Sequence, residues 1–115
     1  MPSDFSQFLP LSPAVLHILL ALVSDDRHGY GIMQEVARQS AGRYKLGPAT
    51  LYENLGKLLE QGIVEESQGS AGDDPRRRYY KLTRFGRKLL SAEISRLESA
   101  IAEAKSHLGI RPRRA

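Results

Sequence analysis

The sequence lacks cysteine altogether, and it also lacks tryptophan. Without cysteine, disulfide bonds, thiolate zinc sites and cysteine nucleophiles are excluded. The absence is compatible with the cytoplasm, which is the location we predict. The histidines His17, His28 and His107 are scattered along the chain, and no cluster of carboxylates accompanies them. We therefore predict no metal site.

Long hydrophobic runs are missing as well. The longest is AVLHILLALV, residues 14–23, which is about half of the roughly 20 residues that a membrane-spanning helix needs. The first residues, MPSDFSQFLPLSP, contain no basic stretch leading into an apolar one, so we expect no signal peptide. These two absences predict a protein without a membrane partner.

The usual patterns of catalytic chemistry are absent too. There are no paired carboxylates, no Ser-His-Asp set and no glycine loop suited to phosphate, so we predict no enzymatic activity and no cofactor. The chain does have a net charge of +4, which permits binding to nucleic acid or anionic lipid. Its 115 residues fit one domain with a modest core, so any large apolar stripe left over needs a partner.

Three helices are predicted in the first half of the chain. Ser12 followed by Pro13 is a typical helix start, and the helix to about residue 23 is apolar on nearly every side. That pattern indicates burial on more than one face. A second helix is expected over 29–40 and a third within GPATLYENLGKLLEQG, residues 47–62.

The third helix has one apolar side and one polar side. Leu51, Leu55, Leu58 and Leu59 form a stripe that faces the core. Tyr52 lies at the edge of this stripe. The opposite face carries residues suited to hydrogen bonding or close approach: Ala49, Thr50, Glu53, Lys57 and Glu60.

A hairpin and a long helix complete the chain. Strands are expected over 63–67 and 78–83, joined by a tip rich in Gly, Ser, Asp and Pro. Alternation in the second strand predicts that Tyr80 and Leu82 face the core, with Tyr79 and Lys81 on the other side. Thr83 is expected to cap a final helix.

This order predicts a mainly α protein with a small β-hairpin, arranged as a winged helix-turn-helix. We expect a DNA-binding unit with an N-terminal arm over 1–83, a dimerisation helix over 84–108 and a basic, disordered tail over 109–115.

Four stretches resemble the PadR family of transcriptional regulators: HGYGIMQEV (28–36), GPATLY (47–52), KLLEQGIV (57–64) and RRRYYKLTRFGRKLL (76–90). The resemblance implies a dimeric winged-helix repressor. The third helix would enter the major groove, the wing would contact the backbone or minor groove, and the C-terminal helix would form the dimer. The short single C-terminal helix is similar to the compact branch of the family. Glu53 and Ala49 depart from the family's usual residues, which affects the operator sequence and not the fold.

The third helix supplies candidates for reading bases. Thr50 and Asn54 have side chains suited to base edges, and Lys57 would reach a phosphate. Glu53 would repel phosphate, so we expect it to read a cytosine amine or to tune specificity. For Tyr52 two roles stay open: packing in the core, or donating its hydroxyl to a phosphate.

The wing supplies candidates for the phosphate backbone. Residues 76–88 include no acid and carry Arg76, Arg77, Arg78, Lys81, Arg84, Arg87 and Lys88. Such a segment suits counterion release from DNA, although Asp73 and Asp74 would neutralise two arginines locally. Arg78 has the alternative of facing the helix. The full set of expected DNA contacts is Tyr30, Lys45, Pro48, Ala49, Thr50, Tyr52, Glu53, Asn54, Lys57, Arg76, Arg77 and Arg78.

The final helix predicts a homodimer. Apolar residues recur at steps of four and three, at Leu90, Ile94, Leu97, Ile101, Ala104 and Leu108. The pattern is short for an isolated coiled coil, and the alternative is that it covers the chain's own first helix. A helix of this length extends about 36 Å, beyond what so small a body covers, and this favours a second copy as the partner.

Two further questions stay open. Some PadR relatives bind aromatic or cationic small molecules between their subunits and release DNA, but this chain has no tryptophan to line such a pocket. A small-molecule effector is therefore left undecided. The alternative function is a winged-helix adaptor whose wing binds an acidic protein partner without specific DNA binding.

Overall fold

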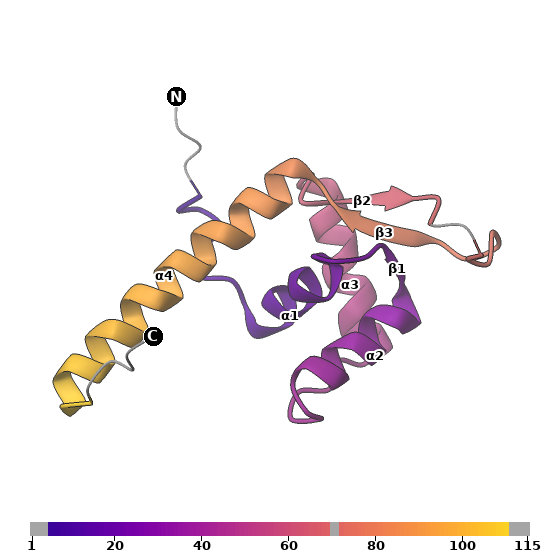
Figure 1. Cartoon of the computed structure of the whole chain (residues 1–115). Helices are drawn as coiled ribbons and strands as arrows, with labels where there is room; N and C mark the ends of the chain where they lie inside the picture. Colours follow the sequence, from indigo (N-terminus) through magenta and orange to yellow (C-terminus); the bar gives the residue numbers. More distant parts are fainter. Residues whose placement is uncertain (1–4, 70–71, 111–115) are drawn as a thin grey trace.

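The computed structural model describes residues 5–69 and 72–110. Three helices and a small sheet form the body, and a long fourth helix projects from it (Figure 1). The elements in chain order are α1 (Pro13–Leu22), β1 (Arg27–His28), α2 (Gly29–Gln39), α3 (Pro48–Glu60), β2 (Val64–Ser67), β3 (Tyr79–Leu82) and α4 (Arg84–Leu108). The predicted fold class is confirmed; of the predicted tail over 109–115, residues 111–115 lie outside the described residues.

The sheet has three antiparallel strands in the order β1-β3-β2. The hairpin of β2 and β3 was predicted. In the structure, Val64 lies opposite Leu82 and Ser67 opposite Tyr79. The third strand was not predicted, because β1 is two residues long and shows no alternation. In this strand Arg27 pairs with Tyr80. The pairing joins the start of α2 to the hairpin of β2, β3 and the loop between them, which is called the wing below.

The helix starts follow the local sequence. Ser12 accepts a hydrogen bond from the Val15 N–H at 3.2 Å, and Thr83 accepts one from the Gly86 N–H at 2.9 Å. These side chains satisfy backbone donors that the first helical turn leaves unpaired. Both predicted caps are confirmed. α4 ends at Gly109, whose φ of +72° suits a glycine after a helix.

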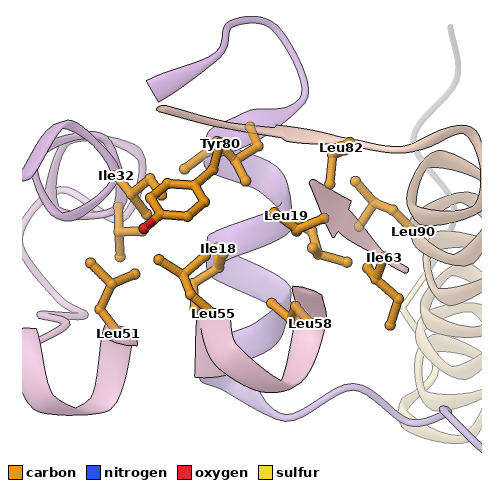
Figure 2. Close-up of a cluster of buried hydrophobic side chains, with 14 of the residues drawn as sticks. Ile18, Leu19, Ile32, Leu51, Leu55, Leu58, Ile63, Tyr80, Leu82 and Leu90 are labelled. Carbon is orange, nitrogen blue, oxygen red and sulfur yellow. The ribbon is translucent and has the colours of Figure 1, made fainter. Parts of the chain in front are cut away.

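The core lies where α1, α2, α3, the sheet and the start of α4 meet (Figure 2). Its labelled members are Ile18, Leu19, Ile32, Leu51, Leu55, Leu58, Ile63, Tyr80, Leu82 and Leu90, each at most 6% exposed. Full burial of one such aliphatic side chain stabilises the fold by roughly 1.5–3 kcal/mol. In α1 the buried residues are Ile18, Leu19, Ala21 and Leu22, while Leu16 and Leu20 are half-buried and Val23, just after the helix, is exposed.

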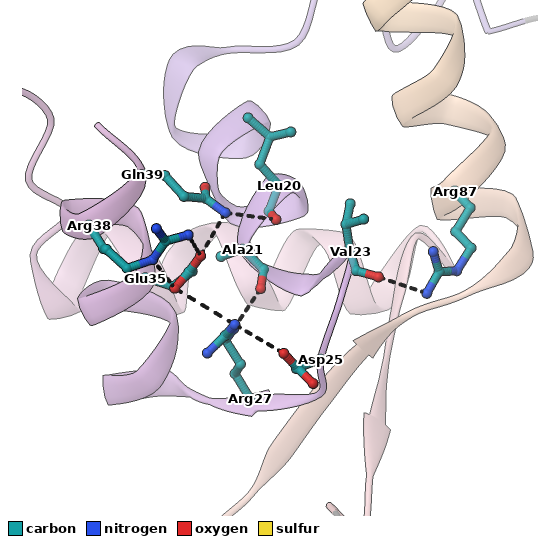
Figure 3. Close-up of polar contacts among 9 residues, drawn as sticks. All are labelled: Leu20, Ala21, Val23, Asp25, Arg27, Glu35, Arg38, Gln39 and Arg87. Carbon is teal, nitrogen blue, oxygen red and sulfur yellow. Dashed lines mark hydrogen bonds and ion pairs between the residues drawn. The ribbon is translucent and has the colours of Figure 1, made fainter. Parts of the chain in front are cut away.

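The carboxyl end of α1 is held by side chains from three other elements (Figure 3). Its last carbonyl groups would otherwise lack partners within the helix. Three carbonyls accept hydrogen bonds from side chains: Leu20 from Gln39 at 3.2 Å, Ala21 from Arg27 at 2.7 Å, and Val23 from Arg87 at 3.0 Å. These bonds attach α1 to α2, β1 and α4 respectively. The Leu20 carbonyl also accepts one from the Val23 N–H at 3.5 Å.

Glu35 connects the side chains of this cluster. It accepts hydrogen bonds from Arg38 at 2.6 and 2.9 Å and from Gln39 at 2.9 Å, and Arg27 lies 3.7 Å away. The hydrogen bond from Arg38, with the nearby charge of Arg27, lowers the pKa of Glu35 to about 2, against the opposing effect of burial. The carboxylate therefore stays ionised at neutral pH.

A second buried carboxylate attaches the N-terminal arm to α4. Glu93 is 1% exposed, accepts a hydrogen bond from the Leu11 N–H at 3.0 Å and pairs with Arg96. The hydrogen bonds from Arg96 hold its pKa below the ordinary value. Phe8 packs edge-on against Phe85, with ring centroids 5.6 Å apart.

Among the described residues, no helix combines the length and apolarity needed to cross a membrane.

Candidate nucleic-acid interface

The start of α3 is open to solvent. Its N-cap residue is Gly47, which offers no side chain to the first N–H groups, and Pro48 follows at the first helical position. Ala49 and Thr50 are exposed, as is Lys45 in the preceding loop. Unpaired N–H groups at a helix start favour an anion such as a phosphate, so this end of α3 is suited to the DNA backbone.

The middle of the exposed face of α3 differs from the predicted set in one residue. Ala49, Glu53, Gly56 and Glu60 are all exposed and lie along one ridge by their spacing of four and three. Sequence reasoning missed Gly56, which has no atom within 4 Å of where a Cβ would be. Ala49 and Gly56 have little or no side chain, so Glu53 and Glu60 are the polar groups of this ridge.

Asn54 and Lys57 lie on the flank of α3 nearest the N-terminal arm, where they line a pocket of about 210 Å³ that includes Phe8. Asn54 is half-buried, and its Nδ2 donates to the Thr50 carbonyl at 2.8 Å. Lys57 lies 3.8 Å from Glu53 across one helical turn. Both predicted contacts therefore already have partners within α3.

The opposite flank of α3 faces the wing. Here a hollow of about 510 Å³ is lined by residues of α2, α3 and β3 and their ends: His28, Gly29, Tyr30, Tyr52, Arg77, Arg78 and Tyr80. Tyr52 is 51% exposed and Tyr30 is 58% exposed. Of the two roles left open for Tyr52, packing in the core is therefore wrong.

Gly29 permits the close approach of Tyr52 to α2. A Cβ at Gly29 would lie 2.1 Å from the Tyr52 hydroxyl, a separation that real Cβ atoms do not show. The hydroxyl of Tyr52 is consequently held against the start of α2 and beside the wing. Sequence reasoning placed Tyr52 at the edge of the stripe, but not this contact, which joins two helices.

The wing arginines are exposed, and each lies near a carboxylate. Arg76 is bound by Asp74 at 3.2 Å, Arg77 lies 4.0 Å from Asp74, and Arg78 lies 4.0 Å from Glu66. Their side chains are 89%, 50% and 79% exposed, respectively. Hydrogen bonds from Arg76 lower the pKa of Asp74. Exposed pairs of this kind are weak, so phosphates can replace the carboxylates.

Tyr79 packs under the loop of the wing. Its hydroxyl accepts a hydrogen bond from the Asp74 N–H at 3.0 Å, and its ring meets the edge of His28 at 5.4 Å between centroids. Tyr79 lies outside the core cluster that holds Tyr80 and Leu82, in keeping with the predicted alternation, but it is only 4% exposed, and this burial was not predicted. The loop of the wing folds over it, which alternation within one strand does not reveal.

The predicted seam of α4 is largely unpaired within the chain. Ile94, Ile101 and Leu108 are 42%, 52% and 73% exposed. Ala104 is exposed and Leu97 is half-buried. Leu90 is the exception, because it is 4% exposed within the core of its own chain. It also lines the groove between α1, α2 and α4, so its place at an interface stays a prediction.

No group of three or more His, Asp or Glu side chains able to hold a metal ion occurs in the part of the chain that the structure describes. The candidate site is instead a surface made of an exposed third helix and a basic hairpin. Three helices followed by such a hairpin define the winged helix-turn-helix class of DNA-binding regulators. Residues 16–92 match the Transcriptional regulator PadR-like family, and the chain belongs to this family.

Sequence relatives share most of this region. The chain is 33% identical over 88 residues to "Transcriptional regulator Rv3488" of Mycobacterium tuberculosis (strain ATCC 25618 / H37Rv), which covers 76% of this chain and 78% of the relative. It is 32% identical over 74 residues to "Uncharacterized protein X" of Lysinibacillus sphaericus, covering 64% and 68%.

Solved structures share the fold. A transcriptional regulator from Clostridium thermocellum, Cth-833, matches with a TM-score of 0.68 and 23% identity over 92% of this chain and 96% of that one. Bacillus subtilis PadR, in complex with operator DNA, matches with a TM-score of 0.62 and 21% identity. That match covers 74% of this chain and 48% of the Bacillus protein, so the chain spans about half its length.

Proposed function

We propose that the protein is a sequence-specific DNA-binding repressor that acts as a homodimer. The observation that carries the proposal is the hollow shared by Tyr52 of α3, the start of α2, and Arg77 and Arg78 of the wing. It brings the flank of the reading helix and the basic hairpin to one surface. The operator complex of the Bacillus relative supports duplex DNA as the ligand of that surface.

In the proposed complex, the two parts of the surface have different tasks. The exposed ridge of α3 enters the major groove, where Thr50 and Glu53 discriminate between bases. The wing arginines exchange their carboxylate partners for phosphates, which supplies affinity without sequence information. Membership of the PadR-like family supports regulation of transcription as the result, and the resemblance to PadR regulators supports repression.

The proposed dimer uses the apolar surface that a single chain leaves in water. A groove of about 530 Å³ runs between α1, α2 and α4, with Leu20, Val23 and Ile94 among its lining residues. The exposed Ile101 and Leu108 continue this surface along α4. We propose that the α4 helix of a second copy covers it, because each buried aliphatic side chain contributes roughly 1.5–3 kcal/mol.

Fluorescence anisotropy with a mixed pool of labelled duplexes tests the proposed ligand. We expect binding that falls on the order of 10³–10⁵-fold between 50 and 200 mM salt, as 6–10 phosphate contacts require. Heparin serves as the control polyanion and is added as an unlabelled competitor. At equal salt, the duplexes that contain the preferred sequence should bind more tightly than heparin. Equal affinity for duplex and heparin would instead identify the adaptor that binds an acidic partner.

A further inference from the structure

His28 is held in one tautomer by the start of α2. Its Nδ1 accepts a hydrogen bond from the Gly31 N–H at 3.0 Å. A backbone N–H always donates, so Nδ1 carries no proton, and in the neutral ring the proton is on Nε2. Burial and the charge of Arg77 lower the pKa of His28, against the effect of Asp73 and Asp74. The ring is therefore neutral near pH 7, with Nε2–H as a donor.

Arg77 lies over this ring. Its Nη1 is 3.0 Å from Nε2 and 3.3 Å from Nδ1 of His28. An atom this close to both ring nitrogens cannot lie in the ring plane, because it would collide with the carbon between them. Guanidinium nitrogens only donate, as does Nε2–H. The contact is therefore a stacking contact, and both side chains keep N–H donors available for an acceptor.

The residues that carry these donors line the hollow beside Tyr52. His28, Arg77 and Arg78 line it together with the two exposed tyrosines. Arg77 pairs with Asp74 and Arg78 with Glu66, each at 4.0 Å, and Asp73 and Asp74 lie near enough to His28 to act on its pKa. The hollow thus presents two positive charges and a neutral donor, and the long, exposed ion pairs of Arg77 and Arg78 are weak enough for a phosphate to replace.

We propose that the hollow seats one phosphate group of the DNA backbone, held jointly by Arg77 and by the Nε2–H of His28. This inference rests on the proposed function and adds a contact to it, from the strand that precedes α2. A single phosphate oxygen can accept from both residues, because Arg77 already lies over the His28 ring. His28 would then cap α2 through one nitrogen and bind DNA through the other.

The test compares His28→Asn with Arg77→Ala in salt titrations of duplex binding. Asparagine is among the best N-cap residues, so His28→Asn keeps the cap of α2 while removing Nε2–H. We expect it to weaken binding about 10-fold with an unchanged salt slope, because a neutral donor releases no counterion. Arg77→Ala should weaken binding and reduce the slope by about 1. The double variant should lose less than the product of the two losses.

His107→Asn is the matched control, since His107 lies on α4 and pairs with Glu103. It should bind DNA as the unaltered chain does. If the unaltered chain binds duplex DNA and His28→Asn binds equally well, the phosphate seat is wrong and the proposed function stands. If the unaltered chain binds no duplex, the proposed function itself fails.

A measurement on the unaltered chain keeps the inference testable should His28→Asn fail to fold. ¹⁵N-detected NMR of the ring should show the Nε2–H tautomer, with Nε2 shifting when duplex DNA is added. A proton on Nδ1, or an Nε2 resonance unmoved by bound DNA, would overturn the proposal. Inorganic phosphate is added separately, and an equal shift with it alone would identify a free-phosphate site in place of the DNA backbone.

Discussion

At the scale of the residue, Glu35 makes the free energy of unfolding depend on pH in the acid range. Its pKa in the folded chain is lowered to about 2 from an ordinary value of about 4.5. A depressed carboxyl pKa adds stability above the ordinary value, and this stability is lost as the pH falls through the folded value. The affected contacts are the ion pair with Arg27, which joins α2 to β1, and the hydrogen bonds from Arg38 and Gln39 within α2.

The variant Glu35→Gln should therefore lose stability that depends on pH. We expect its free energy of unfolding at pH 6 to be lower by about 2 kcal/mol, as for loss of a charged hydrogen-bonded group. The difference should shrink as the pH falls from 4.5 towards 2. Urea unfolding across this range measures it, with the exposed Glu103→Gln as control. A difference that stays constant with pH would contradict the ionised pairing of Glu35.

Two glycines in helices predict opposite results for the same substitution. A Cβ at Gly86 would lie 2.2 Å from the carbonyl oxygen of Ile63, the residue before β2, so Gly86→Ala forces α4 away from this residue. We expect a loss of about 1–3 kcal/mol. Gly56→Ala meets nothing within 4 Å and should stabilise the helix by about 0.5–1 kcal/mol. Thermal unfolding of both variants measures this, and equal shifts would contradict the close packing at Gly86.

At the scale of the element, the helices were predictable and β1 was not. Capping residues and apolar spacing act within one helix, which is why Ser12 and Thr83 mark helix starts in the sequence as in the structure. A two-residue strand has no such signal, and its pairing with β3 depends on the rest of the fold. For the same reason the burial of Tyr79 and of Leu90 was not predicted, because residues outside their own strand or helix cover them.

The candidate site was predictable to a similar extent. The exposed start of α3 and the basic wing follow from residue types and their order. The hollow between them does not, because it depends on Gly29 letting Tyr52 approach and on His28 lying under Arg77. Gly56 was missed because glycine contributes no side-chain chemistry to a pattern, although it shapes the ridge.

The wing and α3 should separate affinity from specificity. Replacing Arg76 and Arg77 by alanine should weaken binding to every duplex and reduce the salt slope by about 2, one for each lost phosphate contact. Thr50→Ala should leave the slope unchanged and change which base is preferred, by about 1–3 kcal/mol. Parallel anisotropy titrations on several duplexes measure both effects. If the two variants behaved alike, the division of tasks between α3 and wing would be wrong.

The exposed seam of α4 predicts the effect of a charge placed in it. Ile101→Glu should dissociate the proposed dimer, because a carboxylate would be buried without a partner. Ser99→Glu puts the same charge on an exposed position on another side of the helix and should leave the dimer intact. Sedimentation at micromolar concentration measures both. A monomer for the unaltered chain, or equal behaviour of the two variants, would contradict the proposed interface.

At the scale of the whole molecule, the chain is elongated, with extents of 53 × 38 × 28 Å, because α4 projects beyond the body (Figure 1). Joining two copies through α4 would place two reading helices and two wings about a two-fold axis. Dimeric helix-turn-helix proteins place their half-sites about 34 Å apart, one turn of the duplex. α4 would set this spacing here.

Selection of bound fragments from random duplex DNA, followed by counting chains per duplex, tests the central claim most directly. The account predicts a two-fold symmetric consensus with half-sites about one helical turn apart, bound by two chains. A consensus without symmetry bound by one chain, or no enrichment at all, would contradict it.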